Sequence, residues 1–214
     1  MKMRPPKSLW ARYIRSMFVA ESLVQARDRL GLTQAEVAGL LGTRQATVCA
    51  FECGRLQVDQ GIRDRIESFT CLRAGSSYAE GWPATLASTA AALHSDVSVL
   101  ADEVDMLRLI IQAADDFARL SAADDRRFFL ARPGPTGSVR WDALLGALAV
   151  ELCRRYGLET TPGWTRQPDR YLNETWWVGA AGEVETLRAL ALRDSPPAFR
   201  ARGVMMGRQI LEST

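Results

Sequence analysis

The sequence predicts a mostly α-helical protein. Apolar residues recur at intervals of three and four over most of its 214 residues, and glycine and proline interrupt this periodicity where helices would end. Residues 204–206 are a candidate for a short strand, and the run 171–178 is expected to be a short element between two breaks. We therefore expect an N-terminal unit of four to five helices, a central long helix with a heptad pattern, and a small, mostly helical C-terminal domain.

Composition excludes several classes of protein. With 47% apolar and 24% charged residues, the chain has the balance of a soluble globular protein. No apolar run approaches the roughly 18–20 residues of a membrane span, and the N-terminus lacks the apolar core of a signal peptide, so we expect a cytoplasmic protein and no membrane partner. The only histidine, His94, would have to serve any histidine-based catalytic site, and we therefore expect no enzymatic activity.

The four cysteines show no spacing typical of a metal site or a disulfide framework. No Cys-x-x-Cys pair occurs. Cys49 and Cys53 would share one face of a helix, but no histidine or third nearby cysteine completes a ligand set. We therefore expect reduced thiols, no metal and no cofactor.

Positive charge is concentrated near the N-terminus. Residues 1–75 contain 12 basic and 7 acidic side chains, although the net charge of the whole chain is only +2. Residues 1–17 are basic and contain no acid, which suits an arm that follows DNA phosphates or enters a minor groove.

Helix-start and helix-stop signals divide residues 18–75. Gly31 ends a first helix of about 18–30, and Thr33 with Glu36 forms a capping box that opens a second. Gly42 ends the second helix, and we expect Thr43 to cap a third helix that starts near Arg44. Gly54 stops the third helix, and residues 58–74 have the apolar spacing of a fourth.

These residues closely resemble the helix-turn-helix family of the phage repressors and Cro proteins, the XRE family. The resemblance is carried by Gly-Leu-Thr-Gln-Ala-Glu-Val-Ala from position 31, Leu-Gly-Thr-x-Gln-Ala-Thr-Val from position 41 and Phe-Glu-x-Gly from position 51. It implies that the third helix lies in the major groove of double-stranded DNA. The implied DNA-contacting residues are Gln34, Arg44, Gln45, Ala46, Thr47, Cys49, Ala50 and Arg55.

Within that resemblance, each part of the surface has an expected role. Gln45 is the leading base reader, because a glutamine can make a bidentate contact with adenine. Gln34 and Arg44 match positions that hold phosphates. Cys49 and Ala50 stand where many relatives have long polar side chains, so direct base contacts are expected to be few. Arg27 and Glu52 match a structural ion pair between the first and third helices.

The middle of the chain has a heptad pattern. Residues 76–84 are expected to form a linker, and residues 85–131 a helical dimerisation segment. The alternative is an amphipathic helix that packs within its own chain, because the same apolar stripe serves both. The acidic residues of this segment, including Asp116 and Asp125, are expected on a solvated face. The expected seam consists of Leu86, Leu93, Val97, Leu100, Val104, Leu107 and Ile111.

Residues 136–214 are expected to form a domain that binds a partner or a ligand. Trp141, Leu144, Leu148 and Leu152 predict an amphipathic helix that ends at Gly157. The phrases RWDALLGALA and SPPAFRARG are similar to C-terminal regions of actinobacterial regulators, some paired with toxins. That resemblance implies a protein partner such as a cognate toxin, with Arg200 and Arg202 as candidate contacts.

The sequence therefore predicts a dimeric, sequence-specific DNA-binding transcriptional regulator, a repressor of its own operator and the antitoxin of a toxin-antitoxin pair. The alternative is a regulator that senses a small molecule in an apolar pocket of its C-terminal domain. The aromatic content of that domain permits such a pocket.

Overall fold

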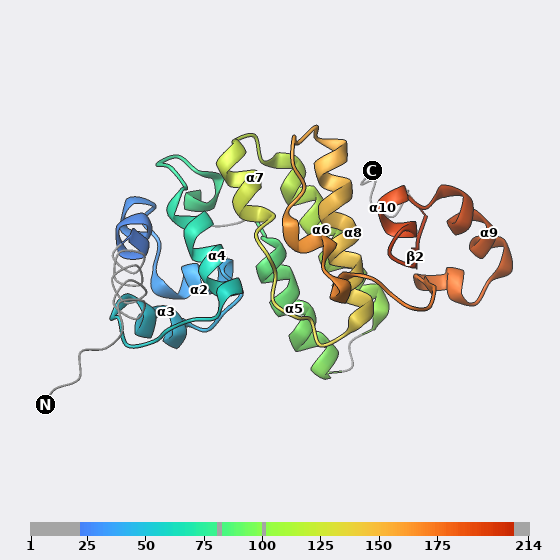
Figure 1. Ribbon diagram of the computed structural model, residues 1–214, viewed down its shortest axis with the longest axis horizontal. Helices are drawn as coiled ribbons and strands as arrows, with labels where there is room; N and C mark the ends of the chain where they lie inside the picture. The colour runs from blue at the N-terminus through green and yellow to red at the C-terminus, as the bar shows by residue number, and fades with distance from the viewer. Residues whose placement is uncertain (1–21, 81–82, 100–101, 208–214) are drawn as a thin grey trace, which may run out of the picture.

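The computed structural model describes residues 22–80, 83–99 and 102–207. The predicted basic arm, residues 1–17, lies outside these ranges. The described chain is mostly α-helical, as predicted, and contains one sheet of two short parallel strands. Figure 1 shows the elements in three successive groups, with residues 22–72 at one end, α5 to α8 in the middle, and α9 with the strands at the other end.

The N-terminal group consists of four helical segments, as predicted. They are residues 22–29, α2 (Gln34–Leu40), α3 (Gln45–Glu52) and α4 (Gln60–Thr70). Gly31, Gly42 and Gly54, which follow the first three, all have positive φ, a conformation that favours glycine. One boundary was wrong, because the residue that caps α3 is Arg44 rather than Thr43, and no side chain caps the helix.

The predicted linker is a packed junction rather than a free connection. Ser77–Glu80 form a short 3-10 helix, η1, and Tyr78 is fully buried. The carboxylate of Asp125 accepts a hydrogen bond from Ser76 Oγ at 2.8 Å and one from the Ser77 backbone N–H at 2.9 Å. Asp125 is therefore a buried anchor, which corrects its expected position on a solvated face.

The long central helix that was expected is divided into shorter ones. The segment forms three helices, α5 (Leu86–Val99), α6 (Glu103–Arg119) and α7 (Ala123–Phe129). Asp102 caps α6 by accepting a hydrogen bond from the Val104 N–H, which marks a new helix start. Asp116, also expected on a solvated face, is buried and accepts hydrogen bonds from Ala84 N and Gln112 Nε2.

The predicted dimer seam is largely occupied within the chain. Leu86 and Leu93 are fully buried and Leu107 nearly so, whereas Val104 is half exposed and Ile111 is partly buried. Because α5 and α6 pack against each other and against α8, the heptad leucines fill an intramolecular core. This packing contradicts the expected interchain seam and supports the alternative, in which the apolar stripe packs within its own chain. Leu100 and the side chain of Val97 lie outside the described part.

The described residues from 83 onward pack into a second part of the molecule, which we call the body, and helix α8 (Val139–Arg155) lies at its centre. It ends at Tyr156, with Gly157 in a positive-φ conformation, as predicted. Its buried side chains lie on every face because α5, α6, α10 (Pro197–Arg200) and the 3-10 helices η2 (Gly163–Arg166) and η3 (Pro168–Arg170) surround it. The core is therefore continuous across the expected domain boundary near residue 136.

The last group of elements completes this core. Strand β1 (Trp176–Trp177) pairs in parallel with β2 (Val204–Met205), which confirms the short strand expected at 204–206. The run 171–178, expected only as a short element, supplies the partner strand. Helix α9 (Glu185–Asp194) follows η4 (Gly179–Gly182). Arg202, expected at a partner surface, is buried and donates to the carbonyls of Ala198 and Thr165, whereas Arg200 is exposed.

Contacts of α4 and of the end of α2 fix the N-terminal group against the body. Phe69 of α4 meets Phe128 of α7 edge to face, with ring centroids 5.5 Å apart. The Thr85 hydroxyl donates to the carbonyl of Leu40 at the end of α2, at 2.7 Å. A side chain at Gly42 would clash with the Ala87 carbonyl, so α2 and α5 meet closely at this glycine.

Candidate nucleic-acid interface

The start of α2 has the geometry that its sequence predicts. The Thr33 hydroxyl accepts a hydrogen bond from the Glu36 N–H at 3.2 Å, and the Glu36 carboxylate accepts one from the Thr33 N–H at 2.7 Å. The backbone and side-chain hydrogen bonds from Thr33 lower the pKa of Glu36. The capping box therefore satisfies two backbone N–H groups and fixes where α2 begins.

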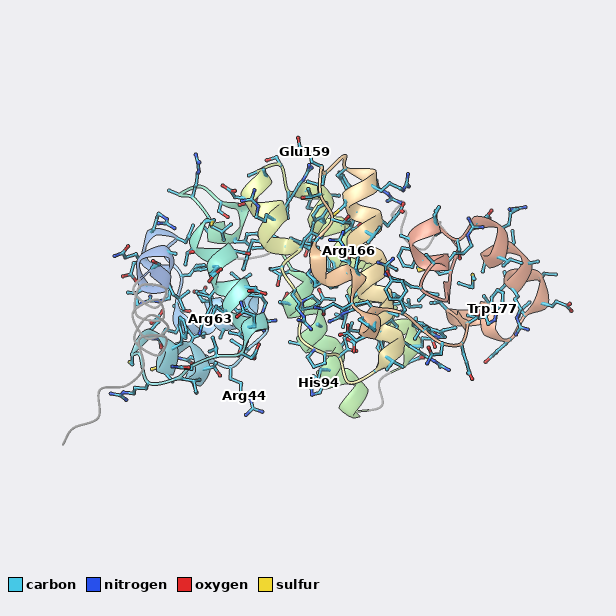
Figure 2. The ribbon with its side chains drawn as sticks, viewed as in Figure 1. Arg44, Arg63, His94, Glu159, Arg166 and Trp177 are labelled. Atoms are coloured by element: carbon cyan, nitrogen blue, oxygen red, sulfur yellow. The ribbon has the colours of Figure 1, made fainter. Side chains whose placement is uncertain are left out.

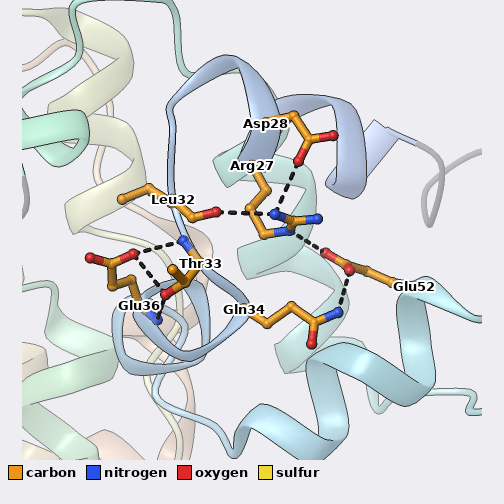
Figure 3. A network of polar contacts seen from close by, with 7 residues as sticks. All are labelled: Arg27, Asp28, Leu32, Thr33, Gln34, Glu36 and Glu52. Atoms are coloured by element: carbon orange, nitrogen blue, oxygen red, sulfur yellow. Dashed lines mark hydrogen bonds and ion pairs between the residues drawn. The ribbon is translucent and has the colours of Figure 1, made fainter.

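An ion pair joins the first helix to α3, as the sequence predicts. Arg27 Nε donates to Glu52 Oε1 at 3.0 Å, and the Glu52 side chain is only 6% exposed (Figure 3). Arg27 Nη1 also donates to the Leu32 carbonyl at 3.1 Å and lies 3.0 Å from an Asp28 carboxylate oxygen. These contacts fix the end of α3 relative to the first helix and the loop before α2.

Gln34 belongs to the same network, which the sequence did not predict. Its Nε2 donates to Glu52 Oε2 at 2.7 Å, so the second carboxylate oxygen is also occupied (Figure 3). Gln34 was expected to hold a phosphate. Its side-chain amide nitrogen instead links α2 to α3. A phosphate contact by its backbone N–H stays a prediction.

Most of the predicted DNA-contacting residues lie together on α3. Arg44, Gln45, Ala46 and Cys49 are exposed, whereas Thr47 and Ala50 are partly buried. On the opposite side of the helix, Val48 and Phe51 enter the core. Arg55 is exposed just after the helix. The structure therefore places most of these residues at the surface of α3, while the opposite face of the helix packs into the core.

The N-terminus of α3 is electropositive. No side chain caps it, so first-turn N–H groups remain available to an anion, and the helix dipole adds partial positive charge there. Arg44, at the cap position, projects from this end into solvent (Figure 2). These features together suit a phosphate group.

The described residues contain no metal-binding cluster. Cys49, Cys53 and Cys71 are exposed free thiols and Cys153 is buried, and no group of three or more metal-ligating side chains converges within the described ranges. In the same ranges, none of the helices has the length and apolar character needed to cross a bilayer.

The sequence analysis did not identify three further arginines that lie near α3 in the structure. Arg65, Arg132 and Arg170 line a cleft between the N-terminal group and the body, and Arg65 and Arg170 are almost completely buried. No periodicity or motif marks them, because their proximity depends on the packing of α4, the loop after α7 and η3.

Comparisons of the chain with family models, with curated proteins and with solved structures found no match. The functional assignment therefore rests on the residues and their geometry.

Proposed function

We propose that the chain is a sequence-specific DNA-binding transcriptional regulator that represses its own promoter. The observation that carries the proposal is the N-terminal half of α3, where an uncapped helix end presents Arg44 and Gln45 to solvent. The Arg27–Glu52–Gln34 network supports it further, because a helix that reads bases needs a fixed position relative to its neighbours.

Different side chains on this surface have different expected roles. Gln45 can donate and accept toward one adenine edge, so it would discriminate between sequences. Arg44 would contact a phosphate, which contributes affinity on any sequence. Ala46, Cys49 and Ala50 offer only small side chains, so part of the specificity would come from DNA shape.

Two substitutions test these roles. We expect Gln45→Ala to weaken binding to the cognate site by about 1–3 kcal/mol with little effect on unrelated DNA. We expect Arg44→Ala to weaken binding to all sequences evenly and to reduce the salt slope by about one. Fluorescence anisotropy at several salt concentrations measures both. Equal losses on every sequence for both variants would refute the separation of roles.

A homodimer on a two-fold symmetric operator remains part of the proposal, but through another surface. Leu86 and Leu93 are already covered inside each chain, so a dimer through them would require the body to open. Light scattering with and without operator DNA distinguishes a dimer in solution from two monomers that assemble on DNA.

The antitoxin role is also proposed, and it requires a protein partner. Helix α9 has exposed apolar side chains at Leu187 and Leu192, which supports a partner at the C-terminal end of the molecule. Co-purification with the product of an adjacent gene, compared between the unmodified chain and Leu192→Asp, tests this role. Retention of the partner by Leu192→Asp would exclude α9 as the contact.

A further inference from the structure

A cleft of 980 Å³ separates α3 and α4 from the body. Its walls come from the α2–α3 turn and the start of α3, the first turns of α4, one side of α5, the loop after α7, and η3. Its volume is that of a small-molecule site. In Figure 2, Arg44 and His94 lie on the same side of the molecule, from the two opposite walls of this cleft.

The cleft has an excess of positive charge. Four arginines line it, Arg44, Arg65, Arg132 and Arg170, against two acids, Asp59 and Asp169. Burial lowers the pKa of Arg65 and of Arg170, and the positive charge of Arg132 lowers both further. Carboxylates act in the opposite direction and raise the pKa, Asp59 that of Arg65, and Asp142 and Asp169 that of Arg170. Arg132 therefore lies close enough to Arg65 and to Arg170 to repel each of them.

Two of these guanidinium groups are buried and incompletely satisfied. Arg65 is 4% exposed, and its Nη1 donates to the Arg132 carbonyl at 2.8 Å, but its Nε has no hydrogen-bond partner. Arg170 is 2% exposed, and its Nε also lacks a hydrogen bond, although the Asp169 carboxylate lies 3.6 Å away. Buried donors without acceptors are rare, because each costs free energy.

Arg170 and Arg132 differ in how firmly the protein holds them. Arg170 Nη1 contacts the Asp142 carbonyl at 3.3 Å and its carboxylate at 3.4 Å, and the guanidinium lies over the Trp164 ring. Within the described ranges, the guanidinium of Arg132 has no hydrogen bond or ion pair. Together with the exposed Arg44, it is therefore available to a ligand that enters the cleft.

We propose that this cleft binds a small phosphate-bearing anion and that the bound anion competes with DNA. Guanidinium groups match the geometry of phosphate oxygens and form charge-assisted hydrogen bonds with them. Arg65 and Arg170 line the cleft but are only 4% and 2% exposed, so the backbone of a rigid duplex is too wide to contact them, and the expected ligand is a small anion.

The competition follows from shared residues and rests on the proposed function. Arg44 and Thr47 line the cleft and also belong to the surface expected to contact DNA. An anion held at the cleft would neutralise Arg44 and occupy the start of α3. Binding of the anion and binding of DNA would then be mutually unfavourable, with equal effects in both directions.

Calorimetric titration of the full chain with inorganic tripolyphosphate, at constant ionic strength, tests the site itself. We expect Arg132→Gln to weaken tripolyphosphate binding about tenfold, since one charge-assisted contact is lost. Arg200→Gln, which removes an exposed arginine on α10 outside the cleft, should bind like the unmodified chain. If Arg132→Gln does not fold, Arg44→Gln replaces it, because Arg44 is exposed.

Absence of binding, or equal binding by Arg132→Gln and the unmodified chain, overturns the site. Displacement of DNA by tripolyphosphate tests the competition. For Arg132→Gln, we expect the tripolyphosphate concentration that displaces half of the DNA to be about tenfold higher than for the unmodified chain. Binding without displacement, or equal displacement in both proteins, overturns the competition and indicates ionic screening alone. If the chain binds no DNA, the proposed function fails, while the calorimetric result still decides whether the cleft is an anion site.

Discussion

Removal of the Glu52 side chain should destabilise the protein substantially. Its carboxylate accepts hydrogen bonds from Arg27 Nε and Gln34 Nε2 and is 6% exposed. Each bond to a charged group contributes about 1.5–3 kcal/mol, and loss of one partner of a buried pair costs about 3–5 kcal/mol. Arg27 would keep its contacts with Leu32 and Asp28, so we expect Glu52→Ala to cost about 3 kcal/mol, at the lower end of that range.

Urea unfolding at pH 7, followed by circular dichroism, measures this loss. The transition midpoint should fall while the slope stays unchanged, because the folded state keeps its compactness. Glu67→Ala, which removes an exposed acid of α4, should change stability by less than about 0.5 kcal/mol. The loss of stability in Glu52→Gln should lie between the losses in Glu52→Ala and Glu67→Ala. An unchanged midpoint for Glu52→Ala would refute the structural role of the network.

Two further predictions concern the body. Leu93→Ala should lower the free energy of unfolding by about 2–5 kcal/mol without changing the molar mass in light scattering, because Leu93 is buried within its own chain; a change from dimer to monomer in the folded variant would restore the interchain seam. Burial raises the pKa of the Cys153 thiol from 9.0 to about 11, so the unfolded state loses this proton first and the Cys153 contribution to stability is lost as pH rises from 9 to 11. At pH 8 a thiol reagent should modify the three exposed cysteines and leave Cys153 unmodified until denaturant is added, and rapid native modification of all four would contradict its burial.

Local signals predicted the N-terminal group well. Capping boxes and helix-ending glycines depend on hydrogen bonds and φ angles within a few residues, so Thr33, Gly31 and Gly42 could be interpreted directly. The Arg27–Glu52 pair came from the family resemblance. Gln34 was placed by the same resemblance, but its contact with Glu52 depends on how the helices meet.

Long-range packing could not be predicted from the same signals. A seven-residue repeat of leucine suits an interchain coiled coil and also helices that pack within one chain. The two differ in what covers the leucines, and the repeat does not contain that information. Similarly, Asp125 and Arg170 look like surface charges in sequence. Their burial depends on partners 49 and 28 residues away, respectively.

The most direct test of the central claim is salt-dependent binding of the purified protein to the DNA upstream of its own gene, against a scrambled duplex of equal length. We expect a clear preference for the upstream duplex, with an affinity that falls steeply as the salt concentration rises. Equal binding to the two duplexes by the folded protein would contradict an autorepressor that reads its operator through α3.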